Sequence, residues 1–195
     1  MKKILFSTAL ALLGTGAFAQ SNTWNVDASH SNVRFTVTHL VISEVEGAFR
    51  KFNGNLVSAK PDFTDAAINF AVDINSIDTD NDGRDKHLKG DDFFNGEKYP
   101  NMTFRSTSFR KLSGNKYELK GNLTIRDITK PVTFAVTYGG TVKDPWGNIK
   151  AGFKASTSIN RFDYNLKWNS VTEAGGAVVG KDVAIDLKLE FAQAK

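Results

Sequence analysis

Hydrophobic and polar residues alternate along much of the chain. In the stretch NVRFTVTH, residues 32–39, Val33, Phe35, Val37 and His39 share one parity, while polar residues occupy the other. A period of two is typical of a strand with one buried and one exposed face. The pattern therefore predicts a strand over residues 32–39, with His39 pointing inward at its end.

The same alternation predicts strands at residues 68–74, 117–125, 132–138, 149–159 and 183–191, with shorter candidates at 23–27, 47–57 and 102–109. Turn-forming pairs such as Gly114-Asn115 and Gly139-Gly140 separate them. Only residues 83–94, expected to form a short helix, and residues 162–180, expected to be irregular, depart from the pattern. We therefore predict an all-β fold, an antiparallel meander of about eight strands with one short helix.

Strands with one apolar face must stack as a sandwich or close into a barrel, and closure also removes exposed edges. Predicted strands as long as residues 116–126 and 150–160 favour a barrel of strongly tilted strands. A barrel of this size holds either its own side chains or one small ligand. The inward parity is rich in Phe, so the alternation leaves a filled core and a ligand cavity both open.

The N-terminus, MKKILFSTALALLGTGAFA, has two lysines, an apolar run and a small-x-small site. This pattern predicts a signal peptide over residues 1–19, cleaved after Ala19 and leaving one domain over residues 20–195 in the periplasm. Without Lys2 and Lys3, 23 basic residues face 21 acidic ones, so the formal charge falls from +4 to +2. A nearly balanced charge removes the main support for nucleic-acid binding. The chain has no cysteine, which excludes disulfides, thiol nucleophiles and thiolate metal ligands.

No catalytic or metal site is expected from the remaining motifs. The segment DASHS, residues 27–31, holds Asp, His and Ser, but catalytic triads are assembled from distant segments. The three histidines match no zinc spacing. Residues 78–83, DTDNDG, match half of a calcium loop, whose second half fails because Lys86 and Lys89 stand where oxygen ligands are needed. We expect no metal and no cofactor.

Two arginines lie next to carboxylates in sequence, in Arg84-Asp85 and in RFDY, residues 161–164. The simplest interpretation is structural: ion pairing, helix capping or bonds to strand ends. The alternative is a cationic group at a cavity mouth that meets an anionic headgroup.

Several segments occur in the order typical of one bacterial family: WNVDASHSNVRFTVTH, GAFRKFNG, RDKHL followed by FF, GNLTIRDITKPVTF, GFKASTSINRFDY and VAIDLKLEF. On these segments the chain resembles the YceI family of exported lipocalin-like proteins. The resemblance implies an extended antiparallel barrel whose apolar tunnel binds an isoprenoid chain, such as a polyprenyl phosphate or an isoprenoid quinone. It favours a non-enzymatic binding or carrier protein that makes transient membrane contact, and an edge of the barrel would allow a homodimer.

The resemblance also implies the ligand-binding residues. Those expected on the lumen are Phe35, Val37, His39, Phe49, Phe70, Phe104, Phe134, Phe153 and Leu187. Those expected in a helix and plug at one end are Leu88, Phe93 and Phe94. Arg84, His87 and Arg161 are expected near the headgroup, and Asp85 is a further ligand-binding candidate. Two alternatives remain: a lipid-modifying enzyme with His39 and Asp85 as acid and base, and a filled barrel that serves as an interaction module.

Overall fold

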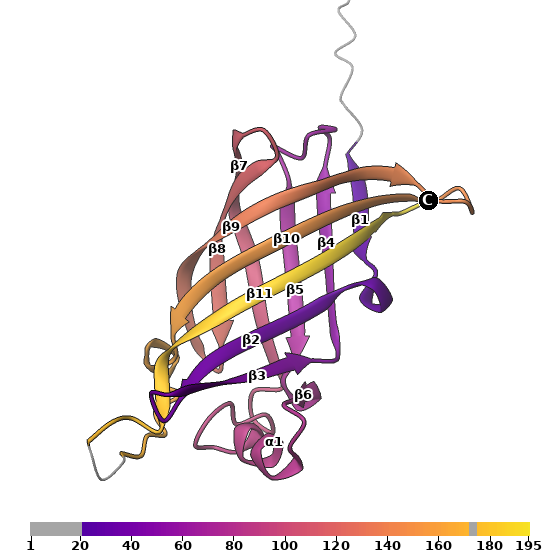
Figure 1. Cartoon of the computed structure of the whole chain (residues 1–195). Helices are drawn as coiled ribbons and strands as arrows, with labels where there is room; N and C mark the ends of the chain where they lie inside the picture. The colour runs from indigo at the N-terminus through magenta and orange to yellow at the C-terminus, as the bar shows by residue number, and fades with distance from the viewer. Residues whose placement is uncertain (1–20, 172–174) are drawn as a thin grey trace, which may run out of the picture.

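The computed structural model describes residues 21–171 and 175–195, so the predicted signal peptide lies outside the described residues. Eleven strand segments form one antiparallel sheet that closes on itself (Figure 1). They are β1 (Asn22–Val26), β2 (Asn32–His39), β3 (Ser43–Phe49), β4 (Phe52–Ser58), β5 (Ala67–Asp73), β6 (Ile77–Asp78), β7 (Asn101–Ser113), β8 (Lys116–Ile125), β9 (Ile128–Lys143), β10 (Ile149–Asn160) and β11 (Val179–Gln193).

These segments make an eight-stranded barrel because three pairs of consecutive segments each act as one interrupted strand. β1 and β2 both pair with β11, and β3 and β4 pair in turn with β2 and β1. β6 then pairs with β3, and β5 pairs with β4. From β7 to β11 each strand pairs with the next one in the chain. The predicted antiparallel meander of about eight strands is confirmed.

Two of the interruptions have clear local causes. Between β1 and β2, a single 3-10 turn, η1 (Ala28–His30), is capped by Asp27, whose Oδ1 accepts a hydrogen bond of 3.1 Å from the Ser29 amide. Between β3 and β4, the amide of Arg50 donates to the Ser76 carbonyl at 3.0 Å and that of Lys51 to the Ser76 hydroxyl at 2.9 Å. The prediction of one strand over residues 47–57 was therefore wrong, because the backbone leaves the ladder at Arg50 and Lys51 to bind Ser76.

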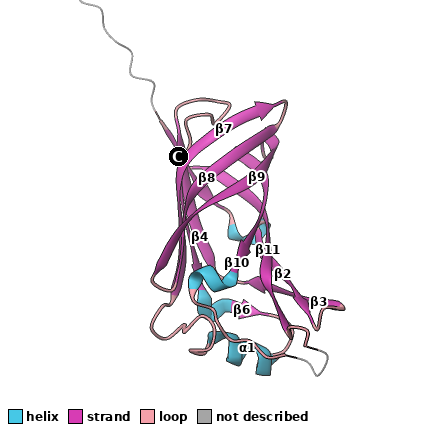
Figure 2. Ribbon diagram, turned by 90° about the vertical axis from the view of Figure 1, so that its left-hand side faces the viewer, coloured by secondary structure: helices cyan, strands magenta, loops and turns pink. Residues whose placement is uncertain are grey.

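One end of the barrel, the helix end, is covered by α1 (Asp82–Lys89) and the segment after it (Figure 2). The Asn81 side chain caps α1 by accepting a 2.9 Å bond from the Arg84 amide. The helix stops at Lys89, short of the predicted residue 94. The described part of the segment expected to be irregular begins within the short 3-10 helix η3 (Arg161–Tyr164) and lies at the same end.

The opposite end, the hairpin end, carries the β7–β8 and β9–β10 turns and the C-terminus (Figure 1). The β4–β5 connection closes it with Phe63, which is 2% exposed and contacts the rings of Trp24, Tyr138 and Phe153 at centroid distances of 5.3, 5.6 and 5.4 Å. Asp65 holds this connection by accepting hydrogen bonds from the Ser58 hydroxyl and from backbone amides. No helix among the described residues is long and apolar enough to cross a membrane.

Candidate functional site

The barrel lumen contains two cavities that share the wall residues Val33, Met102 and Ile185. The hairpin-end cavity has a volume of about 100 Å³, and the helix-end cavity has a volume of about 90 Å³. Each is several times the roughly 15 Å³ that one water molecule requires. Because the two cavities have common walls, they form successive parts of one lumen that runs along the barrel.

Strand parity makes this lumen apolar, because inward positions of β2, β5, β7, β8, β9, β10 and β11 carry Val, Ile, Leu and Phe. Thr103 is the one hydrophilic residue in the wall of the hairpin-end cavity. The wall of the helix-end cavity includes Arg34, which is exposed, and Arg161, which is buried. An apolar wall with one buried charged residue, Arg161, at its end suits a ligand with a long apolar tail and a polar head.

Most of the predicted ligand-binding residues lie in the cavity walls. The wall of the hairpin-end cavity includes Phe70, Phe104, Phe134, Phe153 and Leu187. The wall of the helix-end cavity includes Phe35, Val37, Phe49, Leu88, Phe93, Phe94 and Arg161. Direct contact of these residues with a ligand stays a prediction.

Four of the predicted residues lie outside both cavity walls, among them His87, whose Nε2 lies 2.9 Å from Asp92 Oδ2. His39 is half-buried at the end of β2, opposite Val179 of β11. Arg84 donates from Nε to the Thr79 hydroxyl at 2.8 Å and from Nη2 to the Thr79 carbonyl at 2.6 Å. Asp85 accepts from the Thr79 amide at 2.9 Å. Arg84 and Asp85 thus fasten α1 to the residue after β6, as the structural interpretation of this pair predicted.

Arg161 is 2% exposed and donates only to backbone carbonyls among the described residues. Its Nε binds Gly180 at 2.8 Å and its Nη2 binds Val179 at 3.1 Å. Its Nη1 binds Leu166 at 2.6 Å and Trp168 at 2.7 Å. These four bonds tie the chain after η3 to the start of β11. The neighbouring Asp163 is exposed, and the guanidinium binds carbonyls instead of this carboxylate, two of them at the start of β11.

The charge of Arg161 has consequences for the cavity beside it. Burial lowers the pKa of the guanidinium from its ordinary value, yet an arginine remains protonated in proteins. Among the described residues, no carboxylate forms an ion pair with it. Carbonyl dipoles solvate this cation without neutralising it, so the helix-end cavity has a positively charged residue in its wall.

A second arginine fixes the cover at the helix end. Arg126 donates from Nη1 to the carbonyls of Asp91, Phe93 and Asn165, each at 3.2 Å, and from Nη2 to the Asp91 carboxylate at 3.0 Å. These bonds connect the β8–β9 turn with the segment after α1 and the segment after η3. They hold Phe93 in its place in the cavity wall.

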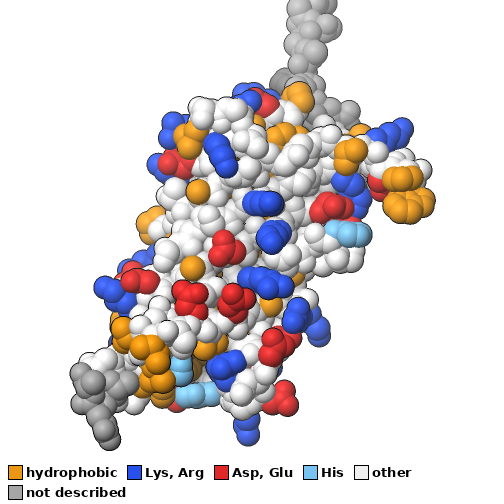
Figure 3. Space-filling model, in the orientation of Figure 1, with side chains coloured by type: hydrophobic (Ala, Val, Ile, Leu, Met, Phe, Trp, Pro, Cys, Tyr) orange, Lys and Arg blue, Asp and Glu red, His pale blue; other side chains and the backbone are white. Residues whose placement is uncertain are grey.

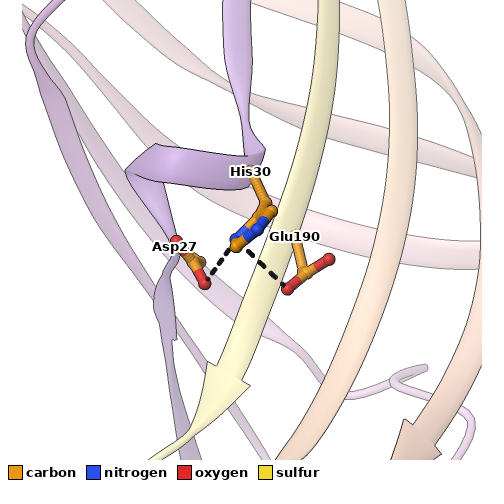
Figure 4. A group of neighbouring side chains, drawn as sticks. All are labelled: Asp27, His30 and Glu190. Carbon is orange, nitrogen blue, oxygen red and sulfur yellow. Dashed lines mark hydrogen bonds and ion pairs between the residues drawn. The ribbon is translucent and has the colours of Figure 1, made fainter. Parts of the chain in front are cut away.

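Outside the barrel, Asp27, His30 and Glu190 form the one group of three neighbouring metal-ligand side chains among the described residues (Figure 4). Lys150 occupies this group, with its Nζ 2.6 Å from Asp27 Oδ2 and 3.1 Å from Glu190 Oε1. Its hydrogen bond is the main reason that the pKa of Asp27 lies well below the usual range. An ammonium group already neutralises these carboxylates, so we assign no metal to them.

The same cluster excludes the triad interpretation of DASHS. The Ser29 hydroxyl and the Asp27 carboxylate both approach the same His30 atom, Nδ1, each at 3.1 Å. A triad requires the carboxylate on one ring nitrogen and the nucleophile on the other. The cluster instead stabilises the turn between β1 and β2.

The sequence-derived list missed several wall residues. Val33, Ile185 and Leu189 could have been found, because they share the parity of the predicted inward residues. Met102 lies near the start of β7 and contributes to both cavities. Phe63 belongs to neither cavity wall but closes the hairpin end, and it gave no periodic signal because it is a single aromatic residue in a connection.

The family assignment follows from comparison with known proteins. A model of the YceI-like domain matches residues 24–191. The chain belongs to the YceI-like family. Protein YceI of Salmonella newport is 35% identical over 198 residues, covering 100% of both chains.

Two solved structures share this YceI-like fold. The crystal structure of Burkholderia cenocepacia BcnA matches with a TM-score of 0.74 and 25% identity over 85% of this chain and 98% of that chain. A polyisoprenoid binding domain from Saccharophagus degradans, implicated in plant cell wall breakdown, matches with a TM-score of 0.64 over 88% of this chain and 98% of that chain. Its 17% identity shows the fold alone.

Proposed function

We propose that this protein binds a long isoprenoid lipid in its barrel lumen and carries it in the periplasm without catalysing a reaction. The observation that carries the proposal is the apolar lumen of two adjoining cavities, with the buried cation Arg161 at one end. The description of the Saccharophagus degradans domain as polyisoprenoid binding supports the same ligand class.

The energetics of such a ligand fit the lumen. Each methylene removed from water contributes roughly 0.8 kcal/mol, and a prenyl tail leaves no polar atom unsatisfied against Val, Leu and Phe. The uncompensated charge of Arg161 favours an anionic headgroup, so a polyprenyl phosphate fits the helix end better than a quinone does. His39 and Asp85, the candidate acid and base, lie outside both cavity walls, which supports binding over catalysis.

Native mass spectrometry of the exported protein, followed by organic extraction, tests this function. We expect a bound mass in the range of a prenyl lipid and a polypeptide that begins at Gln20. Protein that remains free of lipid after incubation with polyprenyl phosphates and isoprenoid quinones would contradict the lipid function. A polypeptide that retains residues 1–19 would contradict export by cleavage.

We further propose that the β2–β3 turn touches the membrane when the lipid is exchanged. Leu40, Val41 and Ile42 are 37%, 66% and 85% exposed, and Figure 3 shows hydrophobic side chains gathered at this corner of the molecule. The φ angles of Leu40 and Val41 are +52° and +66°, a region that is costly for a β-branched residue. The Leu40 amide donates a hydrogen bond of 2.9 Å to the Val178 carbonyl. The next residue in the chain, Val179, belongs to the wall of the helix-end cavity.

Flotation with phospholipid vesicles checks this contact. We expect Val41→Asn, which suits a positive φ, and Ile42→Asn to lower the vesicle-bound fraction several-fold, because apolar insertion drives such binding. Trp146, 82% exposed at the hairpin end, provides the control, and Trp146→Ser should leave binding unchanged. Equal losses of vesicle binding from the substitutions at both ends would contradict an oriented contact.

A homodimer stays a prediction that sedimentation of the same protein can check.

A further inference from the structure

Three glycines of the barrel wall lie directly beneath phenylalanine rings of a neighbouring strand. Gly47 of β3 pairs with Phe35 of β2, and Gly54 of β4 pairs with Phe70 of β5. Gly121 of β8 lies beside Phe104 of β7, whose register partner is Leu123. Phe35 belongs to the wall of the helix-end cavity, and Phe70 and Phe104 belong to the wall of the hairpin-end cavity.

Each ring occupies the space that a side chain on its glycine would need. A Cβ at Gly47 would lie 2.4 Å from Cζ of Phe35, and a Cβ at Gly54 would lie 2.4 Å from Cδ2 of Phe70. At Gly121 the distance to Cζ of Phe104 would be 2.3 Å. None of the three glycines has a φ in the left-handed region, so backbone conformation does not require them. What requires glycine here is the close approach of the ring.

This arrangement determines how much of the lumen the rings fill. A phenylalanine that packs over a glycine lies against the barrel wall, whereas one beside a larger residue must project further toward the barrel axis. Ordinary carbon–carbon contact begins near 3.5 Å, so a Cβ at these positions would displace the ring by roughly 1 Å. Such a displacement narrows the lumen and removes space for the side branches of a bound chain.

We propose that these glycine–phenylalanine pairs set the bore of the lumen and thereby select a methyl-branched isoprenoid chain over an unbranched acyl chain. The inference rests on the proposed lipid function and adds a basis for its specificity. A straight alkyl chain fits a narrow tube, whereas every isoprene unit carries a methyl branch that needs a wider one. The pairs at Gly47 and Gly54 act on different cavities, so the bore is set in both halves of the lumen.

Calorimetric titration of the full chain with geranylgeraniol and with hexadecanol tests the proposal, because the two alcohols have equal main-chain length and differ in branching and unsaturation. Phytanol, branched but saturated, separates these two factors. Wild-type protein should bind geranylgeraniol and phytanol more tightly than hexadecanol. Gly47→Ala and Gly54→Ala should each reduce the preference for the branched alcohols about tenfold. Gly152→Ala is the matched control, since a Cβ there meets no atom within 4 Å.

Compensating variants separate an effect on the width of the lumen from an effect on the stability of the protein. Phe70→Leu added to Gly54→Ala, or Phe35→Leu added to Gly47→Ala, should restore the preference by returning space to the lumen. Gly121→Ala is a poor test, because its Cβ would also lie 2.5 Å from the Arg105 carbonyl oxygen. At Gly47 the close atoms all belong to side chains of Phe35 and Thr79, so this variant should fold even where Gly54→Ala does not.

The outcomes distinguish this inference from the proposed function. Wild-type protein that binds none of the three alcohols and no prenyl phosphate would contradict the lipid function itself. Wild-type protein that binds them, combined with a folded Gly47→Ala variant whose preference equals that of Gly152→Ala, would overturn only the role of the glycine–phenylalanine pairs.

Discussion

The two halves of the lumen have similar volumes and different construction. Regular strands wall the hairpin-end cavity, and the aromatic cluster around Phe63 closes that end. The helix-end cavity is walled partly by residues of α1, the segment after it and η3, and it includes the buried cation Arg161. The charged group Lys150–Asp27 near the hairpin end lies on the outside of the barrel instead.

This difference follows from backbone hydrogen bonding. In a closed barrel the strands satisfy one another's amides and carbonyls, so their inward face can be wholly apolar. Irregular segments leave carbonyls that need other donors, and Arg161 and Arg126 supply them. The same requirement that brings a cation into the helix end makes that end suitable for a lipid headgroup, while the hairpin end suits the tail.

The largest expected effect on stability is that of Arg161→Met. It would leave the buried carbonyl of Leu166 and the partly buried carbonyls of Trp168, Val179 and Gly180 without this donor, at about 1 kcal/mol each. We expect the free energy of unfolding in urea to fall by about 3 kcal/mol or more. Arg84→Met, which removes bonds to Thr79 alone, should cost about 1 kcal/mol. Equal losses for the two variants would show that Arg161 does not hold the helix end together.

The same arginine gives a functional contrast between the ends. Arg161→Lys keeps the charge and should retain more affinity for farnesyl phosphate than Arg161→Met does. The affinity for farnesol should differ little between these two variants. If both variants weaken the alcohol and the phosphate alike, the positive charge has no role in headgroup binding.

The next effect concerns the length of the tail site. Ala155, 8% exposed, points from β10 into the hairpin-end cavity. Ala155→Leu should fill part of that cavity and lower the affinity for the longest prenyl alcohols about tenfold, while geraniol still binds. Titration with geraniol, farnesol and geranylgeraniol measures the longest prenyl chain that still binds. Ala135→Leu on the exposed face of β9 is the control, and an identical cut-off in both variants would place the tail elsewhere.

The two halves also differ in how far the sequence predicts them. Alternation located the strands that wall the hairpin end, because side-chain direction in a strand depends only on parity. It failed for His39, which has the inward parity but lies past the cavity. The carbonyl bonds of Arg161 and the packing of Phe63 depend on contacts between segments distant in sequence, for which no periodic signal exists. The family resemblance named Arg161 as a candidate, and the structure shows how it is held.

The smallest expected effect comes from the charge outside the barrel. Lys150 and Asp27 have side chains 16% and 19% exposed, and Lys150→Met should lower the free energy of unfolding at pH 7 by about 1–2 kcal/mol. The pKa of the Asp27 carboxyl is lowered in the folded protein, mainly by Lys150. Its contribution is therefore complete above the ordinary value of 3.8 and is lost as pH falls below it. His30 also faces Asp27, and Glu190 faces His30 and Lys150.

Urea unfolding at several pH values measures this dependence. The difference between wild type and Lys150→Met should be constant near neutral pH and shrink as pH falls below 3.8, because Asp27 is protonated first in the unfolded chain and only at lower pH in the folded protein. Lys154→Met, on the exposed face of the same strand, should change stability by less than about 0.5 kcal/mol at every pH. Lipid affinity should be unchanged in Lys150→Met, because a charge on the outer wall does not contact the lumen. A loss of affinity comparable to that of Arg161→Met would remove the distinction between the two ends.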